Sequence, residues 1–150
     1  MTGLNHAVTG ALVAVAAGEP AIALPVALLS HFVIDSLPHW DYEIPGHPKI
    51  RRMVIGLDML MSILLVALLA LMSADSAWLV LACGFLAILP DTMWLPYILY
   101  GKPSPTSGKS PLNRLRHLHF KIQWSESAAG IYAELLWFVT MLGLFLYITD

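Results

Sequence analysis

Apolar runs long enough to cross a lipid bilayer recur along this chain, and they limit what it can fold into. A hydrocarbon core of about 30 Å needs roughly 20 apolar helical residues, because each residue adds about 1.5 Å. One clear run covers residues 53–72, with a single charge, Asp58, near its start. In lipid every backbone polar group needs an internal partner, so such runs form helices. We therefore expect an all-α integral membrane protein with one transmembrane domain, residues 1–150.

Composition agrees with this fold class. Hydrophobic residues make up 58% of the chain and charged residues only 12%, whereas an ordinary soluble domain is about a quarter charged. The net charge of −2 gives no sign of a basic surface, so we expect no nucleic-acid partner. There is one cysteine, Cys83, and an internal disulfide is therefore excluded.

Turn and breaker residues divide the apolar sequence into five expected spans. We expect the transmembrane helices at residues 4–17, 21–37, 53–72, 77–89 and 125–148. Small residues at three- and four-residue steps in the first helix favour close approach of helix backbones in lipid. These small residues are Gly3, Ala7, Gly10, Ala14 and Ala17.

A sixth, shorter helix is expected at residues 111–122. Ser110 and Pro111 are typical of an N-cap followed by proline at the first helical position. Leucines at helical steps beside basic residues are typical of an amphipathic helix that lies on the membrane surface. Alternating apolar and polar residues over 117–123 leave a strand as the alternative.

An internal repeat is a further feature of the spans. Leu37, Pro38 and His39 match Leu89, Pro90 and Asp91 at an offset of 52 residues. This offset indicates two helical hairpins of equal orientation, related by an axis along the membrane normal and followed by a fifth helix. A coincidence between two apolar hairpins of similar length is the alternative.

The basic residues predict the orientation. All eight Lys and Arg residues lie in two stretches, Lys49–Arg52 and Lys102–Lys121. Five spans put both stretches on the side of residue 1, and basic loops face the cytoplasm. We therefore expect a multi-pass protein of the plasma membrane with its N-terminus in the cytoplasm and its C-terminus outside. Membrane lipids are expected partners, and an oligomer is compatible with the sequence.

Histidines and aspartates gather on the same predicted side. His31 and Asp35 are four residues apart, so on a helix they share one face. Imidazole and carboxylate together suit zinc, manganese or iron, and within a membrane such groups need a partner or a function. We expect a divalent metal ion, with zinc first and manganese or iron as alternatives, in one open site or as a carboxylate-bridged pair. The expected ligands are His6, His31, Asp35, His39, Asp58 and Asp91.

Several of these ligands have a purely structural alternative. Asp58 could be a carboxylate near the N-terminus of its own helix, where the helix dipole favours it. Asp91 could cap a broken helix. His6 could be an ordinary interfacial residue. His39 could be a solvated loop residue or could orient another ligand.

Other polar residues suggest roles beside a metal. A basic cluster could hold a phosphate group, or could only attract anionic lipids. A histidine in the same stretch could protonate a leaving group, and a glutamate in the apolar part of the fifth span could orient a ligand histidine or act as a base. The phosphate candidates are Arg114, Arg116 and Lys121, and the catalytic candidates are His117, His119 and Glu134.

Three short motifs resemble those of a known family: Asn5–Gly10, Ser30–His39 and Leu89–Asp91. They are similar to motifs of YdjM-like bacterial proteins, membrane-bound metal-dependent hydrolases that are distantly similar to zinc-dependent phospholipase C. The resemblance covers roughly the first 95 residues and implies a metal, hydrolysis and a bacterial-type inner membrane, without naming a substrate. In that family the Leu-Pro-Asp element precedes the His-x-x-x-Asp helix, whereas here it follows. Arg116–His119 is only a loose substitute for the family's His-Arg-x-x-Thr-His element.

We therefore expect metal-dependent hydrolysis of an amphipathic substrate at the cytoplasmic boundary, with a lipid phosphoester as the leading substrate class. A divalent-cation transporter or binding protein is the first alternative. Against transport, the expected ligands do not recur across the depth of the membrane. A structural adaptor, in which the polar cluster only fixes helix packing, is the second alternative.

Overall fold

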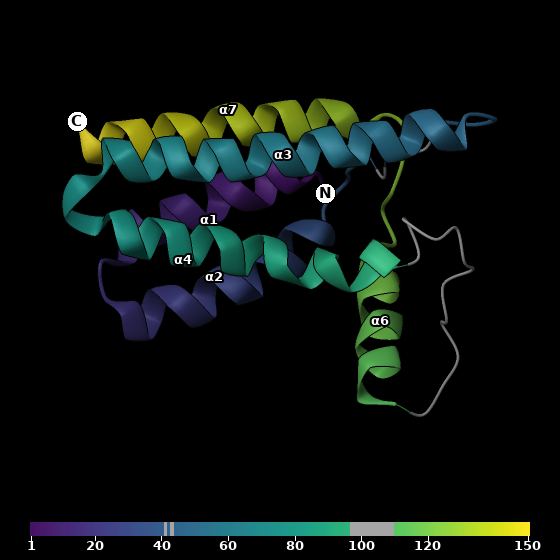
Figure 1. Ribbon diagram of the computed structural model, residues 1–150, viewed down its shortest axis with the longest axis horizontal. Helices are drawn as coiled ribbons and strands as arrows, with labels where there is room; N and C mark the ends of the chain where they lie inside the picture. Colours follow the sequence, from purple (N-terminus) through teal and green to yellow (C-terminus); the bar gives the residue numbers. More distant parts are fainter. Residues whose placement is uncertain (41, 43, 97–109) are drawn as a thin grey trace.

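The computed structural model describes residues 1–40, 42, 44–96 and 110–150 (Figure 1). Over these residues the chain is all-helical, and no strand is present apart from one isolated bridge between His39 and Glu126. The α-helices are α1 (Gly3–Ala17), α2 (Pro20–Asp35), α3 (Pro48–Met72), α4 (Ala77–Ile88), α6 (Pro111–Ile122) and α7 (Gly130–Thr149). Two 3₁₀ helices flank α4, namely η1 (Ala74–Ser76) and η2 (Leu89–Trp94).

Three helical segments are long and apolar enough to cross a membrane. They are α3, the continuous stretch Ala74–Trp94 and α7. The two N-terminal helices are apolar but shorter, at 15 and 16 residues. A helix of that length spans about 24 Å, less than the hydrocarbon core. Membrane-spanning helices are thus supported, whereas the count of five spans stays a prediction.

Helix α1 lies at the centre of the bundle. It packs against α2, α3, α4 and α7, and Figure 1 shows it between them. Gly10 allows the closest approach to α4, because a Cβ there would lie 2.8 Å from Ala87 Cβ and 2.9 Å from the carbonyl carbon of Cys83. Small residues therefore bring the two backbones together, as their spacing predicts.

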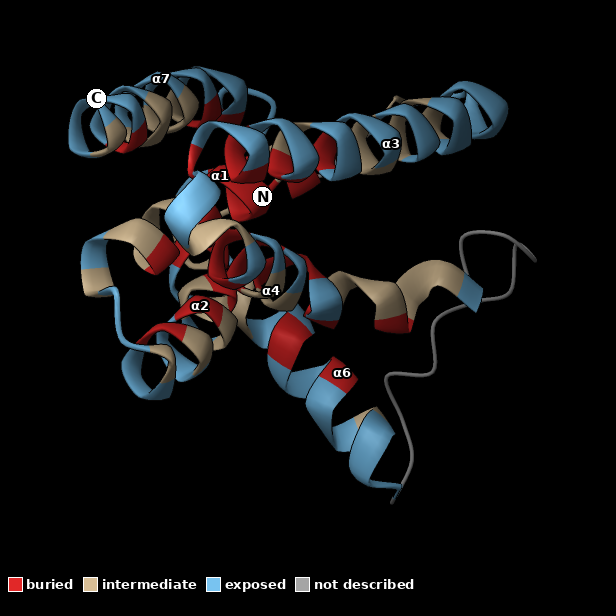
Figure 2. Ribbon diagram, turned by 60° about the vertical axis from the view of Figure 1, so that its left-hand side comes forward, coloured by how far each residue is buried: buried red, intermediate tan, exposed pale blue. Residues whose placement is uncertain are grey.

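The outer faces of the bundle are apolar and exposed. Large hydrophobic side chains cover α3 and α7, for example Leu71 at 81% exposure and Tyr147 at 83%. Figure 2 shows buried residues on the inward faces of the helices and exposed residues along their outer sides. Such a surface suits hydrocarbon, since lipid tails solvate apolar side chains that water would not.

The boundaries of several predicted helices differ from the observed ones. Helix α3 begins at Pro48, five residues before the predicted start, because proline fits the first turn of a helix. Helix α2 ends at Asp35, before Pro38. At Pro90 the chain does not stop being helical but tightens into the 3₁₀ turns of η2. These turns carry Asp91.

Helix α7 begins at Gly130, and not at residue 125 as predicted. The preceding segment uses its backbone elsewhere: Ser127 N donates to His39 O at 2.9 Å, and Glu126 forms the bridge with His39. A Cβ on Gly130 would overlap the backbone carbonyl of His39, so glycine is required where α7 starts. The contact ties α7 to the exit of α2.

Helix α6 has the predicted bounds. The Ser110 side chain accepts a hydrogen bond from Asn113 N at 3.2 Å, which confirms the predicted N-cap. Figure 1 shows α6 running across the direction of the bundle helices, at the end opposite the C-terminus. This direction suits a helix lying on a membrane surface. The stretch that precedes Ser110, residues 97–109, lies outside the described residues.

Candidate metal centre

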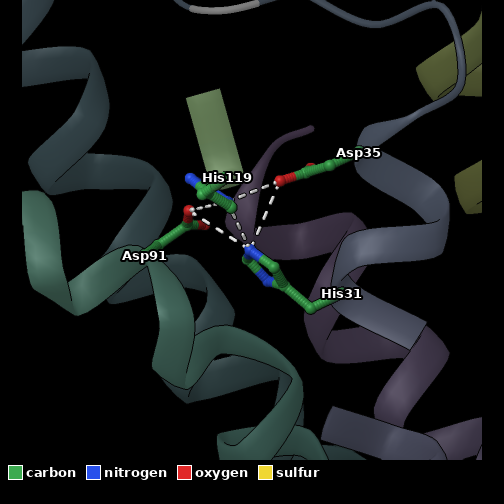
Figure 3. A group of neighbouring side chains, drawn as sticks. All are labelled: His31, Asp35, Asp91 and His119. Atoms are coloured by element: carbon green, nitrogen blue, oxygen red, sulfur yellow. Dashed lines mark hydrogen bonds and ion pairs between the residues drawn. The ribbon is translucent and has the colours of Figure 1, made fainter. Parts of the chain in front are cut away.

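Four side chains from three elements converge at the α6 end of the bundle. His31 and Asp35 come from α2, Asp91 from η2 and His119 from α6. Figure 3 shows the four pointing toward one another. One ligand atom from each lies within 4.8 Å of every other, so the group could hold a metal ion.

The distances within the group fit a shared ion. His119 Nε2 and His31 Nε2 lie 2.9 and 3.3 Å from Asp35 Oδ2, and 3.8 and 3.6 Å from Asp91 Oδ1. The two Nε2 atoms are 2.8 Å apart. Ligand atoms about 2.0–2.2 Å from one tetrahedral ion lie roughly 3.4 Å from each other. The contacts bracket that separation, and the donor set of two imidazoles and two carboxylates suits zinc, manganese or iron.

The group is buried on all sides but one. The side chains of His31, Asp35 and His119 have no exposed surface, whereas the side chain of Asp91 is 29% exposed. Buried carboxylates are costly unless they are paired or bind a metal. The exposed edge at Asp91 is therefore the side from which a substrate or ion could approach.

A backbone carbonyl orients His31. Its Nδ1 donates a hydrogen bond to Ala87 O at 2.7 Å. Because a carbonyl only accepts, Nδ1 carries the hydrogen, and Nε2 of the neutral ring presents a lone pair to the group. Metal-ligating histidines commonly have this arrangement, with the second nitrogen fixed by an outer acceptor.

In His119 the roles of the two ring nitrogens are reversed relative to His31. Trp94 Nε1 donates to His119 Nδ1 at 2.9 Å, and an indole nitrogen only donates. In the neutral ring Nε2 therefore carries the hydrogen, which it can donate to Asp35 Oδ2 or to the His31 lone pair. For His119 to bind an ion through Nε2, the bond to Trp94 would have to break.

Arg116 anchors α6 beside the group. Its guanidinium donates through Nε and Nη2 to Met93 O, at 3.3 and 3.0 Å, and through Nη1 to Asn113 Oδ1 at 3.0 Å. The side chain is buried, one helical turn before His119. A cation at the carbonyl end of η2 is favourable. Arg116, predicted to bind phosphate, thus holds two elements of the site together.

His6 lies beside the four-residue group. Its ring stacks on His31 with centroids 4.0 Å apart, and it is fully buried. Nε2 lies 3.1 Å from Asp35 Oδ1 and 3.8 Å from Asp91 Oδ2. The amino nitrogen of Met1 also donates to Asp35 Oδ1, at 2.6 Å.

Asp58, predicted as a ligand, is placed elsewhere. Its carboxylate accepts from Gly3 N at 2.8 Å and from Leu4 N at 3.2 Å, at the start of α1. Tyr42 also donates to it, at 2.7 Å. Burial raises the pKa of the Tyr42 phenol well above 10.0, and the neighbouring Asp58 carboxylate raises it further, so the phenol keeps its proton. The sequence left open a carboxylate at the N-terminus of Asp58's own helix, but the structure places Asp58 well inside α3 and against the start of α1 instead.

Glu134, predicted to be catalytic, is likewise occupied with structural contacts. The buried carboxylate accepts from Trp40 N at 2.9 Å, Asn5 Nδ2 at 3.2 Å and Thr2 N at 3.3 Å. These bonds join α7 to the start of α1 and to the segment after α2. All three partners are donors, as an ionised carboxylate requires.

His39 lies apart from the four-residue group. Its Nδ1 donates to Leu37 O at 2.7 Å. Its buried Nε2 has no hydrogen-bond partner within the described part of the chain and lies 3.9 Å from Glu126 Oε1. A role for His39 as a metal ligand stays a prediction. Asp41, which follows it, lies outside the described residues.

The remaining candidates on α6 face outward. Arg114, His117 and Lys121 are exposed, so none contributes to the buried group. Leu115 and Leu118 are also exposed, whereas Arg116 and His119 point inward. Arg116 and His119, three residues apart on α6, therefore contact the bundle, and the exposed leucines are available to contact lipid.

Sequence reasoning missed several contributors to the site, among them Trp94, Gln123 and the carbonyl of Ala87. Trp94 lies one turn after Asp91, and Gln123, whose Nε2 is 3.4 Å from Asp35 Oδ2, lies one turn after His119. Helical spacing from each predicted residue could have found both. The carbonyl of Ala87 gives no signal in the sequence, since every residue carries one.

Comparison with protein-family models, curated proteins and solved structures found no match. The resemblance to YdjM-like proteins stays a prediction.

Proposed function

We propose that this protein is a membrane-embedded, metal-dependent hydrolase that cleaves a phosphoester of an amphipathic lipid at the cytoplasmic boundary. Zinc is the proposed metal, with manganese or iron as substitutes. The single observation that carries the proposal is the convergence of His31, Asp35, Asp91 and His119 from elements far apart in sequence.

The chemistry of the group favours hydrolysis. A divalent ion bound there would supply a Lewis acid and an activated water for attack on phosphorus. His31 offers a fixed lone pair, and Asp35 is fully buried, so both suit ligation. Asp91 suits ligation at the open edge, where a substrate can arrive.

His119 suits the transfer of a proton. Trp94 leaves the hydrogen of the neutral ring on Nε2, at the side of the group. From there the ring can donate to an oxygen of a leaving group that enters beside Asp91. Exposed Arg114 and Lys121 on α6 can attract the phosphate of a lipid head group.

The exposed apolar surface supports an amphipathic substrate. The exposed apolar faces of α3 and α7 suit lipid, and α6 crosses the bundle direction beside the site with exposed leucines. A lipid in the membrane around the helices would reach the exposed edge of the group at Asp91 without leaving the membrane. A water-soluble substrate is not concentrated in the membrane in this way, so we expect lipid phosphoesters to be preferred over their water-soluble analogues.

Turnover of a lipid-phosphoester panel by purified protein in detergent micelles tests the proposal. We expect phosphate or head-group release that needs zinc or manganese, stops with chelator and is lost in Asp35→Ala. Asp75→Ala is the matched control, because Asp75 is exposed in η1. Metal uptake into vesicles without turnover would favour a transporter, and a metal-free protein of equal stability would favour a structural role.

A further inference from the structure

We infer a second cation position next to the four-residue group, formed by His6 with the remaining oxygens of Asp35 and Asp91. The inference rests on the proposed metal function and extends it to a pair of divalent ions. The first ion of the pair is the one proposed for His31, Asp35 and Asp91.

The carboxylate oxygens are divided between two sets of histidines. Asp35 Oδ2 faces His31 and His119, whereas Asp35 Oδ1 faces His6 at 3.1 Å. Asp91 is divided in the same way, with Oδ1 facing His31 and His119 and Oδ2 lying 3.8 Å from His6 Nε2. Two carboxylates that each present one oxygen to either side have the arrangement of ligands that bridge two ions.

His6 supplies the independent observation. It is fully buried, and among the described residues neither of its ring nitrogens has a hydrogen-bond partner. Leaving a buried polar group unpaired costs about 1–3 kcal/mol, so native structures seldom keep one without a purpose. Nε2 lies 3.1 Å from Asp35 Oδ1 but lacks the geometry of a hydrogen bond to it. An ion between the two atoms would give Nε2 a partner.

The separations suit this position. Ligand atoms on one tetrahedral ion lie roughly 3.4 Å apart, between the 3.1 and 3.8 Å measured from His6 Nε2. An ion here would displace the Met1 nitrogen from Asp35 Oδ1 or share that oxygen with it. His6 also stacks on His31 at 4.0 Å, which places the two imidazoles side by side toward the two carboxylates.

Two adjacent ions have a chemical consequence. Ions about 3.5–4 Å apart can stabilise both the attacking and the leaving oxygen of an in-line displacement at phosphorus. Removing one ion should then abolish turnover while one metal stays bound.

Metal content after zinc loading and desalting is the first test. We expect two zinc ions per chain in the wild type, one in His6→Gln and two in His47→Gln, which removes an exposed loop histidine as a matched control. One ion in the wild type, or two in His6→Gln, would overturn the second position and leave the proposed hydrolase intact. No bound ion in the wild type would overturn the proposed function and the second position together.

A spectroscopic test does not depend on the variant folding. Manganese-loaded wild-type protein should give the electron paramagnetic resonance spectrum of an exchange-coupled pair, because two shared carboxylates couple the ions. His6→Gln should give the spectrum of an isolated ion. An isolated-ion spectrum from fully loaded wild type would contradict the pair, even if His6→Gln could not be purified.

Discussion

Gly10→Ala tests whether the contact between α1 and α4 positions the site. The new Cβ would lie 2.8 Å from Ala87 Cβ, and carbon atoms pack at about 3.5–4.0 Å, so the helices would have to separate by about 1 Å. Overpacking of this kind costs about 1–3 kcal/mol. The unfolding temperature should fall by roughly 2–4 °C for each kcal/mol.

The same displacement should reach the metal site. Ala87 also provides the carbonyl that accepts from His31 Nδ1 at 2.7 Å. A shift of about 1 Å would weaken that bond, and loss of such an outer partner typically lowers metal affinity about 10- to 100-fold. We therefore expect Gly10→Ala to lose stability and zinc affinity together.

Thermal unfolding and zinc titration of the variant in detergent measure both effects. Gly143→Ala is the matched control, because a Cβ there meets nothing within 4 Å. It replaces glycine within a helix, so its stability should be unchanged or up to about 1 kcal/mol higher. A Gly10→Ala protein with the stability of Gly143→Ala and unchanged zinc affinity would refute the reasoning.

Three further substitutions separate ligands, proton donors and structural residues. Trp94→Phe removes the donor to His119 Nδ1, so it should keep the zinc content and lower kcat about 10- to 100-fold; loss of zinc would show instead that the contact supports ligation. Asp58→Ala removes the acceptor for two amides at the start of α1 and should lower the free energy of unfolding by about 1–2 kcal/mol with unchanged zinc content. A missing ion in that variant would make Asp58 a ligand. Glu134→Gln places an amide donor among three donors and should lower the free energy of unfolding by about 1–3 kcal/mol without changing kcat. Glu19→Gln, at an exposed position, is the control. A large fall in kcat at unchanged stability would instead support a catalytic role for Glu134.

Local patterns predicted the helical class and several details of the fold. The Ser110 cap fixed the start of α6, and the small residues of α1 indicated its close packing with α4. Local patterns could not predict where α7 begins. It is set by backbone pairing between His39 and residues 126–127, which lie far apart in the sequence.

The site was predictable where chemistry and helical spacing coincide. His31 and Asp35 share a face of α2, as their spacing predicted, and their cost in a membrane indicated a partner or a function. Asp58 and Glu134 looked equally unusual in apolar helices, yet their partners are amide hydrogens of other segments. Only the fold decides whether a buried carboxylate meets donors or other ligands.

Anomalous scattering from crystals of the zinc-loaded protein, collected on both sides of the zinc absorption edge, tests the central claim most directly. We predict a zinc peak within bonding distance, about 2.0–2.2 Å, of His31 Nε2 and of oxygens of Asp35 and Asp91. A fully loaded crystal in which these side chains keep their contacts with one another and zinc scatters only from exposed residues would contradict the account.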